Sequence, residues 1–323
     1  MEKLIDIKNL RVDFELRSGR VRAVRDVSLV INKGERLGIV GESGAGKSVL
    51  GFSLINLISK PGKITGGQII FDGRDLTKLN ADQMRHIRGN EISMIFQDPM
   101  MTLNPVLTIG TQMKETILAH MDVSDKEAEA ICLDKLHKVY IPSPEKRLKQ
   151  YPHEFSGGMR QRIVIAISLL TSPKLIIADE PTTALDVTIQ AEIMDLLLEL
   201  CKTENMGLIL ITHDLAVVSE VTQRIAVLYA GKVVELGAAD QLIKNPQHPY
   251  TKGLIQALPQ MAGGKRRLNQ IPGMMPSLLN MPKGCPFEPR CTVSYERCKT
   301  EIPTLHELEN GAQAACFKCE GGE

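Results

Sequence analysis

A glycine-rich loop between a buried strand and a helix constrains this chain most strongly. Residues 41–48 read Gly-Glu-Ser-Gly-Ala-Gly-Lys-Ser, which matches G-x-x-x-x-G-K-S at every fixed position. The apolar run at 36–40 predicts a buried strand before the loop, and residues 49–59 have a helical pattern after it. In such a loop the backbone amides point inward at phosphate oxygens, and the helix N-terminus adds partial positive charge. The sequence therefore predicts a nucleotide phosphate site in an α/β fold.

The motif also assigns roles within this phosphate loop. Lys47 should reach the β- and γ-phosphates, and Ser48 should bind Mg²⁺. We expect nine consecutive residues to contact the nucleotide: Gly41, Glu42, Ser43, Gly44, Ala45, Gly46, Lys47, Ser48 and Val49.

An acidic pair ends a second predicted strand. Apolar residues 175–178 lead directly into Asp179 and Glu180. Ligands of open α/β sheets gather at the carboxyl ends of the strands, so we expect this pair near the phosphate loop. Asp179 is placed to hold Mg²⁺, directly or through water, and Glu180 to polarise an attacking water. These residue types supply the positioning and charge neutralisation that phosphoryl transfer requires.

Strands alternate with helices along most of the chain, which predicts a mainly parallel sheet. Residues 225–236 predict a closing hairpin around Ala230-Gly231-Lys232. After about residue 245 prolines multiply and five of the seven cysteines appear. This loop-rich part cannot bury a large core by itself, so it needs a covalent or metal staple.

Composition narrows the class of protein. The 43% hydrophobic and 24% charged content is typical of a soluble globular chain, and the net charge of +1 gives no sign of a nucleic-acid footprint. No run approaches the roughly 20 apolar residues that span a bilayer. The N-terminus lacks the apolar core of a signal peptide, so we expect a cytoplasmic protein whose membrane partners are other subunits.

Ser156, Gly157 and Gly158 open a predicted helix upstream of the acidic pair. With the phosphate loop and Asp179-Glu180 in the same order, this turn resembles the signature of ATP-binding-cassette (ABC) proteins over residues 4–242. The resemblance implies an ATPase in which each signature completes the ATP site of a partner cassette. Phe155 and Met159 depart from the commonest form of the signature but leave its serine and glycines intact.

The resemblance adds four further site residues. Gln97 is similar to the residue that links metal and water to the membrane-subunit surface, and Asp186 ends a loop (183–186) that crosses between partners. His213 is similar to the switch histidine near the γ-phosphate, and Phe14 is the candidate for stacking on adenine. Gln97 would also approach Mg²⁺. Without the motif order, a structural role would be the ordinary interpretation of Gln97, His213 and Phe14.

The implied fold is an α/β P-loop ABC ATPase core. It has a mainly parallel sheet, an antiparallel β subdomain and a helical subdomain at about residues 100–165. We assign residues 1–244 to the nucleotide-binding domain and 245–323 to a small, loop-rich, cysteine-containing extension.

Three segments resemble the oligopeptide and dipeptide importer branch, namely residues 98–105, 245–254 and 285–291. Residues 93–97 with Met100 and Met101 favour its D-type cassette subunit. The branch implies ATP-driven peptide import with a second cassette, two permeases and an extracytoplasmic peptide-binding protein. The second cassette is usually a paralogue, with a homodimer as the alternative in isolation. The expected location is peripheral, on the cytoplasmic face of the membrane, with no nucleic-acid partner.

Other functions stay open at this stage. Nickel, glutathione or another small solute could be the cargo, because a cassette does not touch what is transported. ABC ATPases of DNA repair or translation are disfavoured, since the chain has neither a long coiled-coil insertion nor tandem cassettes.

The cysteines of the tail form a separate candidate site. Cys285, Cys291, Cys298 and Cys316 are spaced more widely than the C-x₂-C steps of zinc ribbons or ferredoxins. The branch resemblance implies that they hold a [4Fe–4S] cluster with a structural role. Zinc and unliganded thiols remain alternatives, and Cys319 competes with Cys316 as the fourth ligand.

Overall fold

The computed structural model describes residues 2–183, 185–258 and 270–320. It divides into two compact units, which are described in turn. Unit 1 contains residues 1–2, 32–35 and 78–209, and unit 2 contains residues 3–31, 36–77 and 210–323.

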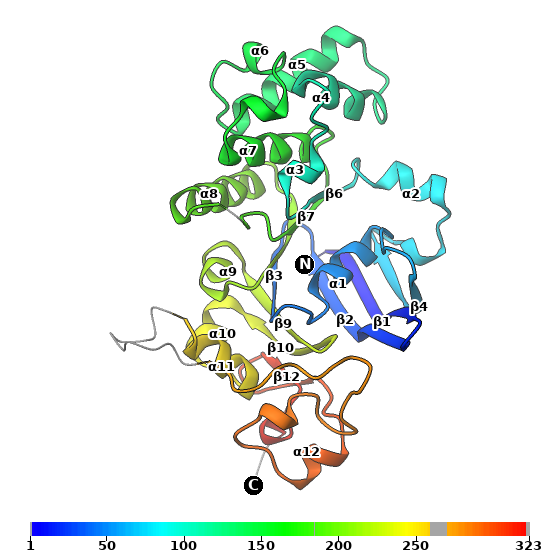
Figure 1. The fold of residues 1–323 in the computed structure, drawn as a ribbon, viewed down its shortest axis with the longest axis vertical. Coiled ribbons are helices and arrows are strands. Elements are labelled where there is room, and N and C mark those ends of the chain that lie inside the picture. The colour runs from blue at the N-terminus through cyan, green and yellow to red at the C-terminus, as the bar shows by residue number, and fades with distance from the viewer. Residues whose placement is uncertain (1, 184, 259–269, 321–323) are drawn as a thin grey trace. The chain divides into compact units, whose positions relative to one another are not determined.

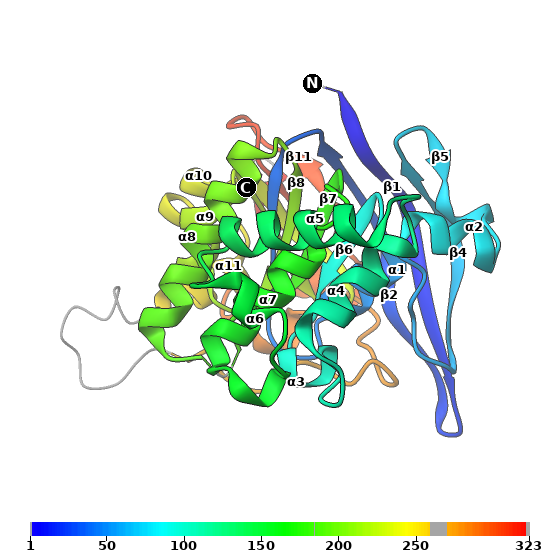
Figure 2. The same cartoon turned by 90° about the horizontal axis from the view of Figure 1, so that it is seen from above.

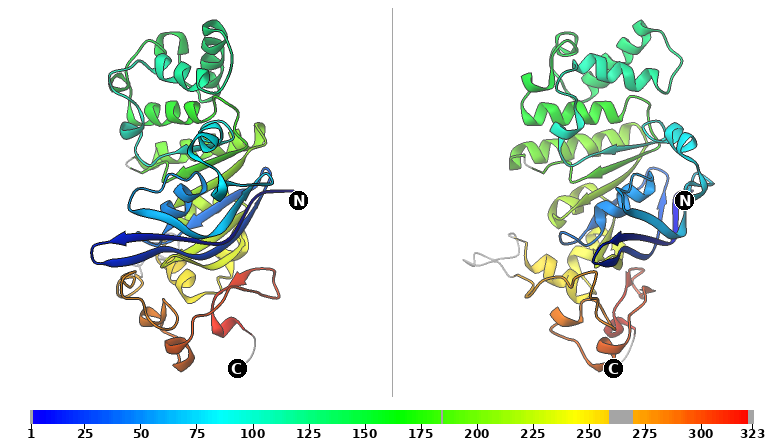
Figure 3. Two further views of the ribbon diagram at one scale, coloured as in Figure 1. Left: turned by 90° about the vertical axis from the view of Figure 1, so that its right-hand side faces the viewer. Right: turned by 45° about the vertical axis from the view of Figure 1, so that its right-hand side comes forward.

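Unit 2 contains an antiparallel sheet of four strands in the order β2-β1-β4-β5. Its strands are β1 (Lys3–Leu16), β2 (Gly19–Asn32), β4 (Gly62–Phe71) and β5 (Arg74–Asp75). The two long strands form the dark blue hairpin in Figure 3. Strand β1 is continuous over its 14 residues. It passes through a shift in pairing register between Lys8 and Arg11, where Asn9 has a φ of 47°.

A second group of strands in unit 2 leads into the phosphate loop. Strand β3 (Arg36–Val40) pairs in parallel with β9 (Arg224–Tyr229), which pairs antiparallel with β10 (Lys232–Ala238). Strand β10 then pairs with β12 (Gln313–Ala314), and β12 with β11 (His306–Glu307). The predicted hairpin is present, and its two turn residues, Ala230 and Gly231, both have positive φ, as a tight primed turn requires.

Unit 2 also contains α-helices, which are labelled in Figure 1. They are α1 (Lys47–Leu54), α9 (Leu215–Val221), α10 (Ala239–Lys244), α11 (Pro249–Gln256) and α12 (Glu296–Thr300). Helix α1 is shorter than the 49–59 pattern suggested, because the chain turns at Asn56, which has a φ of 51°. The tail is less irregular than its prolines suggested: Pro249 occupies the first turn of α11, where its missing N–H costs no helical hydrogen bond.

Unit 1 is built on β6 (Ile92–Ile95) and β7 (Leu175–Asp179), which pair in parallel. All five residues of β7 are buried, in keeping with its continuous apolar sequence. Strand β8 (Gly207–Thr212) begins in this unit. Helices α2 (Ala81–Ile87) and α8 (Val187–Thr203) belong to the same unit.

A helical group fills the rest of unit 1 and gathers in green in Figure 2. It comprises α3 (Pro99–Thr102), α4 (Ile109–Leu118), α5 (Asp125–Lys138), α6 (Pro144–Arg147) and α7 (Gly157–Ser168). Met113, Ile117, Cys132 and Leu136 are fully buried, so α4 and α5 pack through their apolar faces. The predicted α/β fold class is confirmed. Within the described residues, no helix has both the length and the apolar character that a membrane crossing demands.

Candidate nucleotide site and C-terminal cysteine cavity

The phosphate loop turns sharply at two glycines that no other residue could replace without strain. A Cβ atom on Gly41 would lie 2.3 Å from the Leu228 carbonyl oxygen, and one on Gly46 would lie 2.4 Å from the Ala23 carbonyl oxygen. Gly46 also has a φ of 98°. The motif glycines therefore allow the loop to pass against neighbouring backbone.

Lys47 begins helix α1 and is buried. Its Nζ donates hydrogen bonds to the carbonyl oxygens of Gly41 (2.8 Å) and Glu42 (3.1 Å), within its own loop. Ser48 and Val49 are half-buried, whereas Ser43 and Gly44 are exposed. The loop thus places backbone groups and Lys47 at the N-terminus of helix α1, and this arrangement is suited to binding phosphate.

Glu42 is anchored by residues more than 200 positions away. Its amide donates to the Tyr250 hydroxyl at 2.8 Å, and its carboxylate forms a bidentate pair with Arg290 at 2.7 and 2.9 Å. In the sequence, residues 245–254 and 285–291 indicated the transporter branch, and Cys285 and Cys291 were candidate ligands, but Tyr250 and Arg290 were not predicted as site residues. No local pattern could have found them, because the contact is tertiary.

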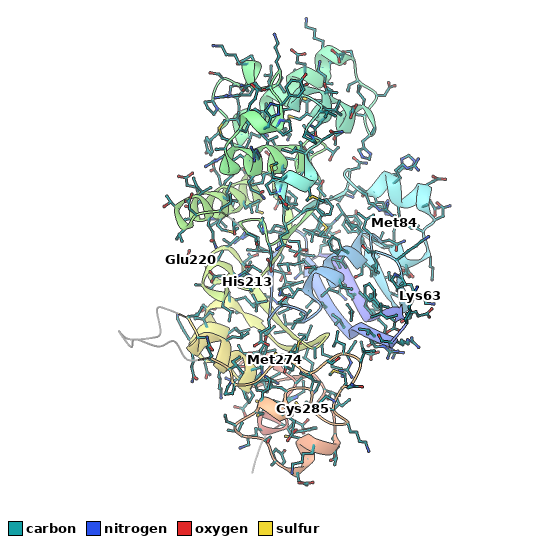
Figure 4. All side chains as sticks on the ribbon, in the orientation of Figure 1. Lys63, Met84, His213, Glu220, Met274 and Cys285 are labelled. Atoms are coloured by element: carbon teal, nitrogen blue, oxygen red, sulfur yellow. The ribbon has the colours of Figure 1, made fainter. Side chains whose placement is uncertain are left out.

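Phe14 and His213 also lie in unit 2. The Phe14 ring packs over Gly62 of the neighbouring strand, where a Cβ would lie only 2.6 Å from the ring. The ring is half-buried, so part of it is available for stacking. His213 is exposed in the turn between β8 and α9 and is labelled in Figure 4. Asp214 caps α9 by accepting from the amides of Ala216 and Val217, which fixes this turn.

Unit 1 brings two of the predicted catalytic residues together. Gln97 Nε2 donates to Glu180 Oε2 at 2.9 Å, and Thr183 Oγ donates to the same oxygen at 3.0 Å. Glu180 has a φ of 46°, an unusual backbone conformation for a residue with a side chain. Asp179 is buried at the end of β7. Strained, hydrogen-bonded carboxylates of this kind gather at functional sites.

The signature turn opens helix α7. Ser156 is its N-cap, and its Oγ accepts from the Met159 amide at 3.4 Å. A Cβ on Gly158 would lie 2.8 Å from Ile189 Cγ2, so the glycine lets α7 approach α8 closely. Phe155, the atypical residue, is buried with the Arg147 guanidinium 5.7 Å from its ring. The Phe155 side chain therefore contributes to packing in the protein interior.

Asp186, predicted to lie in the loop that crosses between partners, is the N-cap of α8. Its carboxylate accepts from the Ile189 amide at 3.0 Å. Ala184 of the same loop lies outside the described residues.

Four predicted cysteines surround one small cavity in the C-terminal segment. Cys285, Cys291, Cys298 and Cys316 line it together with apolar side chains that include Phe287 and Phe317. Cys319 lines a neighbouring cavity, which Cys316 also borders. Figure 4 labels Cys285 in this orange segment. Across the described parts of the chain, no three His, Cys, Asp or Glu side chains converge on the position of a single metal ion.

The thiols differ in acidity. Burial raises the pKa of Cys285 to about 11, and burial also raises the pKa of Cys291. A hydrogen bond from the Cys319 thiol lowers the pKa of Cys316 to about 6, and the same bond raises the pKa of Cys319. Cys316 is therefore more readily ionised at neutral pH than Cys285, Cys291 or Cys319.

Comparisons with known proteins agree with this geometry. The ABC transporter family matches residues 24–183, and the family described as "Oligopeptide/dipeptide transporter, C-terminal region" matches residues 234–298. The dipeptide transport ATP-binding protein DppD of Escherichia coli K12 is 47% identical over 313 residues, covering 97% of this chain and 96% of that protein. The oligopeptide transport ATP-binding protein OppD of Haemophilus influenzae is 47% identical over 317 residues, covering 98% of both.

Solved structures agree as well. A dimeric ATP-binding cassette in a post-hydrolysis state with ADP and Pi superimposes with a TM-score of 0.66 at 28% identity, covering 73% of this chain and 98% of that one. The fold and the phosphate loop define an ATP-binding cassette. The chain belongs to the ABC transporter family and carries the C-terminal region of its oligopeptide/dipeptide transporters. The resemblance drawn from the sequence is confirmed.

Proposed function

We propose that this chain is the ATP-hydrolysing subunit that powers import of dipeptides or oligopeptides across a membrane. One observation carries the proposal: a cassette with a complete phosphate loop continues into a C-terminal region matched to oligopeptide/dipeptide transporters. Relatives named as dipeptide and oligopeptide transport ATP-binding proteins match over almost the whole chain, which favours peptides over nickel, glutathione or another solute.

The site residues supply binding and positioning. In this proposal Lys47 and the loop amides of residues 41–49 hold the phosphates, and Phe14 stacks on adenine. Glu180 orients and polarises the attacking water, and Gln97 and Thr183 fix its carboxylate. His213 contributes near the γ-phosphate.

Ser48, Asp179 and Gln97 have the oxygen ligands that Mg²⁺ prefers. When bound, Mg²⁺ neutralises charge that develops on the phosphates.

Ser156, Gly157, Gly158 and Asp186 act on the nucleotide of a second cassette. The exposed N-terminus of α7, with its serine and two glycines, is suited to a phosphate brought by a partner. A paralogue or a second copy would complete each site, and two permeases would convert closure and reopening into transport at the cytoplasmic membrane face. An extracytoplasmic binding protein would deliver the peptide. Residues 1–244 serve as the nucleotide-binding domain and 245–323 as the extension.

Replacing Glu180 with glutamine tests the catalytic part of the proposal. Glu180→Gln keeps the side-chain size and its contact with Thr183 but removes the base, so we expect ATP turnover to fall at least about 100-fold. ATP binding should persist, and light scattering should show an ATP-dependent dimer. Glu199→Gln, on an exposed part of α8, is the matched control and should hydrolyse ATP at the parental rate. Parental turnover in Glu180→Gln would contradict the assignment.

Transport itself can be measured in cells. Deletion of the gene should abolish uptake of labelled di- or oligopeptides, and the parental gene should restore it while the Glu180→Gln gene does not. If peptide uptake is unchanged and nickel or glutathione uptake is lost, that solute, and not a peptide, is the cargo.

We also propose that the cysteine cavity holds a [4Fe–4S] cluster as a staple of the C-terminal segment. Four thiols around one small, largely apolar cavity fit the donor set of such a cluster. Zinc bound by the same thiols is the alternative occupant, and metal analysis of the purified protein distinguishes the two. Cys316 lines this cavity as well as the neighbouring one, whereas Cys319 lines the neighbouring one, which favours Cys316 as the fourth ligand.

A further inference from the structure

Arg290 of the C-terminal segment binds the side chain of Glu42 in the phosphate loop. Its guanidinium forms the bidentate pair with Glu42, donates through Nε to the Pro272 carbonyl oxygen at 3.0 Å, and lies 3.4 Å from the Tyr229 hydroxyl. The Arg290 side chain is 4% exposed and that of Glu42 is 30% exposed. A charge-assisted, bidentate pair in so buried a place fixes both partners in orientation.

An aromatic cluster holds Arg290 in this position. Tyr229, Tyr250 and Phe287 pack with ring centroids 4.6 to 5.4 Å apart, and the guanidinium lies 5.8 Å from the Tyr229 ring and 5.9 Å from the Phe287 ring. Both tyrosines are fully buried. Because rigid rings surround it, the guanidinium can anchor the loop instead of following its motion.

The loop is thus fixed at two points on its first half. Tyr250 holds the Glu42 amide, and Arg290 holds the Glu42 carboxylate. The Ala45 carbonyl oxygen also accepts from the Gly231 amide at 2.9 Å, in the hairpin turn that follows Tyr229. The first residue after Gly41 therefore faces the C-terminal segment with both its backbone and its side chain.

Charge gives the pair a second effect. An unpaired carboxylate on a phosphate loop would repel a bound triphosphate, and two unit charges interact over several ångströms in a partly buried site. The bidentate guanidinium of Arg290 neutralises this carboxylate, because an arginine side chain stays charged at physiological pH.

We propose that Arg290 is a positioning residue for nucleotide binding, which acts by holding and neutralising Glu42 of the phosphate loop. This rests on the proposed function, since it assumes that the loop binds ATP. Arg290 lies between Cys285 and Cys291, so the extension is directly connected to the nucleotide site. The extension would then contribute to ATP binding, in addition to being a segment that the proposed cluster stabilises.

The full-length chain with Arg290→Gln tests the proposal. We expect the Kd for Mg-ATP, measured by titration calorimetry, to rise about tenfold. KM for ATP should rise in parallel while kcat stays within about twofold, because the reacting groups are untouched. Hydrogen exchange at the amides of residues 41–46 should also become faster. Arg290→Lys keeps the positive charge but lacks the two guanidinium nitrogens that form the bidentate pair, so it should give an intermediate Kd.

The matched control is Arg297→Gln in the same segment. Arg297 also pairs with two carboxylates, Glu301 and Glu320, and lies over the ring of Phe317. Among the described residues, these partners lie outside the phosphate loop. Its Kd and loop exchange should equal those of the parent.

A double-mutant cycle separates this role from general stability. In a Glu42→Gln background, Arg290→Gln should change the Kd by less than about twofold, because no carboxylate remains to be held. An equal loss in both backgrounds, or a parental Kd in Arg290→Gln, would overturn the proposal.

If Arg290→Gln does not fold, Tyr250→Phe is the second variant, because it removes only the hydroxyl that accepts from the Glu42 amide. It should raise the Kd for Mg-ATP about threefold. A parental Kd in Tyr250→Phe would also overturn the proposal. Failure of the parent to bind ATP would instead refute the proposed function.

Discussion

Gly158 illustrates how a single residue of the signature serves packing. The motif alone assigned it to phosphate binding through a backbone free of side chains. The structure adds that a Cβ on Gly158 would lie 2.8 Å from Ile189 Cγ2, whereas one on Gly157 would lie 3.4 Å from Leu185 Cδ2, an ordinary contact. The two glycines are neighbours in sequence but differ in the space around them.

This difference predicts different costs of adding a methyl group. Gly158→Ala should lower the free energy of unfolding by about 1–3 kcal/mol through overpacking, measured by urea denaturation. Gly157→Ala, the matched control, should change it by less than about 0.5 kcal/mol. In an Ile189→Ala background, Gly158→Ala should cost little. Equal stabilities of Gly157→Ala and Gly158→Ala would show that the close approach of α7 to α8 does not constrain the turn.

At the scale of elements, the antiparallel sheet of unit 2 is tied together by one buried carboxylate. Asp13 of β1 is fully buried and accepts from Arg20 Nε and Arg22 Nε of β2 at 2.8 Å and from Thr65 Oγ of β4 at 2.6 Å. Burial alone would raise the pKa of Asp13, but hydrogen bonds from Arg22, Thr65 and Arg20 lower it to about 2. Three strands therefore share one ionised group.

Removing that charge should weaken the sheet. Asp13→Asn should cost about 2–3 kcal/mol of unfolding free energy at pH 7, because it leaves buried donors without their anion. Asp26→Asn, which breaks an exposed pair with Arg11 in the same sheet, is the control and should cost under about 1 kcal/mol.

The same carboxylate predicts a pH dependence. Its folded pKa of about 2 lies below the reference value of 3.8, so its contribution is full above pH 4 and is lost as the pH falls toward 2. Urea midpoints across this window should fall less steeply in Asp13→Asn than in the parent. Identical slopes would mean that folding does not lower the pKa of Asp13.

The elements themselves were largely predictable. Strands β7 and β8 and helix α8 follow from continuous apolar runs or helical periodicity, and the hairpin of β9 and β10 follows from its turn at Ala230-Gly231. The ends of α1 and the continuity of β1 were not predictable. They depend on Asn56 and Asn9, which adopt left-handed conformations that an asparagine permits but that the sequence does not require.

At the scale of the whole molecule, the C-terminal segment depends on residues drawn together from 285 to 316. Proposed ligation by Cys285, Cys291, Cys298 and Cys316 predicts that anaerobically purified protein is brown, absorbs near 400 nm and contains about four irons per chain. Cys316→Ser should lose the iron and lower the unfolding temperature, whereas Cys319→Ser should retain both. Colourless protein with one zinc per chain would contradict the cluster. Loss of iron in Cys319→Ser but not in Cys316→Ser would show that Cys319, and not Cys316, is the fourth ligand.

The sequence by itself determined the phosphate loop, the acidic pair, the signature and the family. These features are local: a few adjacent residues set the turn, the charge and the following helix, and their order along the chain carries the rest. Only the tertiary structure decided that Gln97 and Thr183 hold Glu180, that four of the five tail cysteines share a cavity, and that Tyr250 and Arg290 hold Glu42. Such contacts join residues far apart in the chain, and their energies depend on burial and on distances that no local pattern encodes.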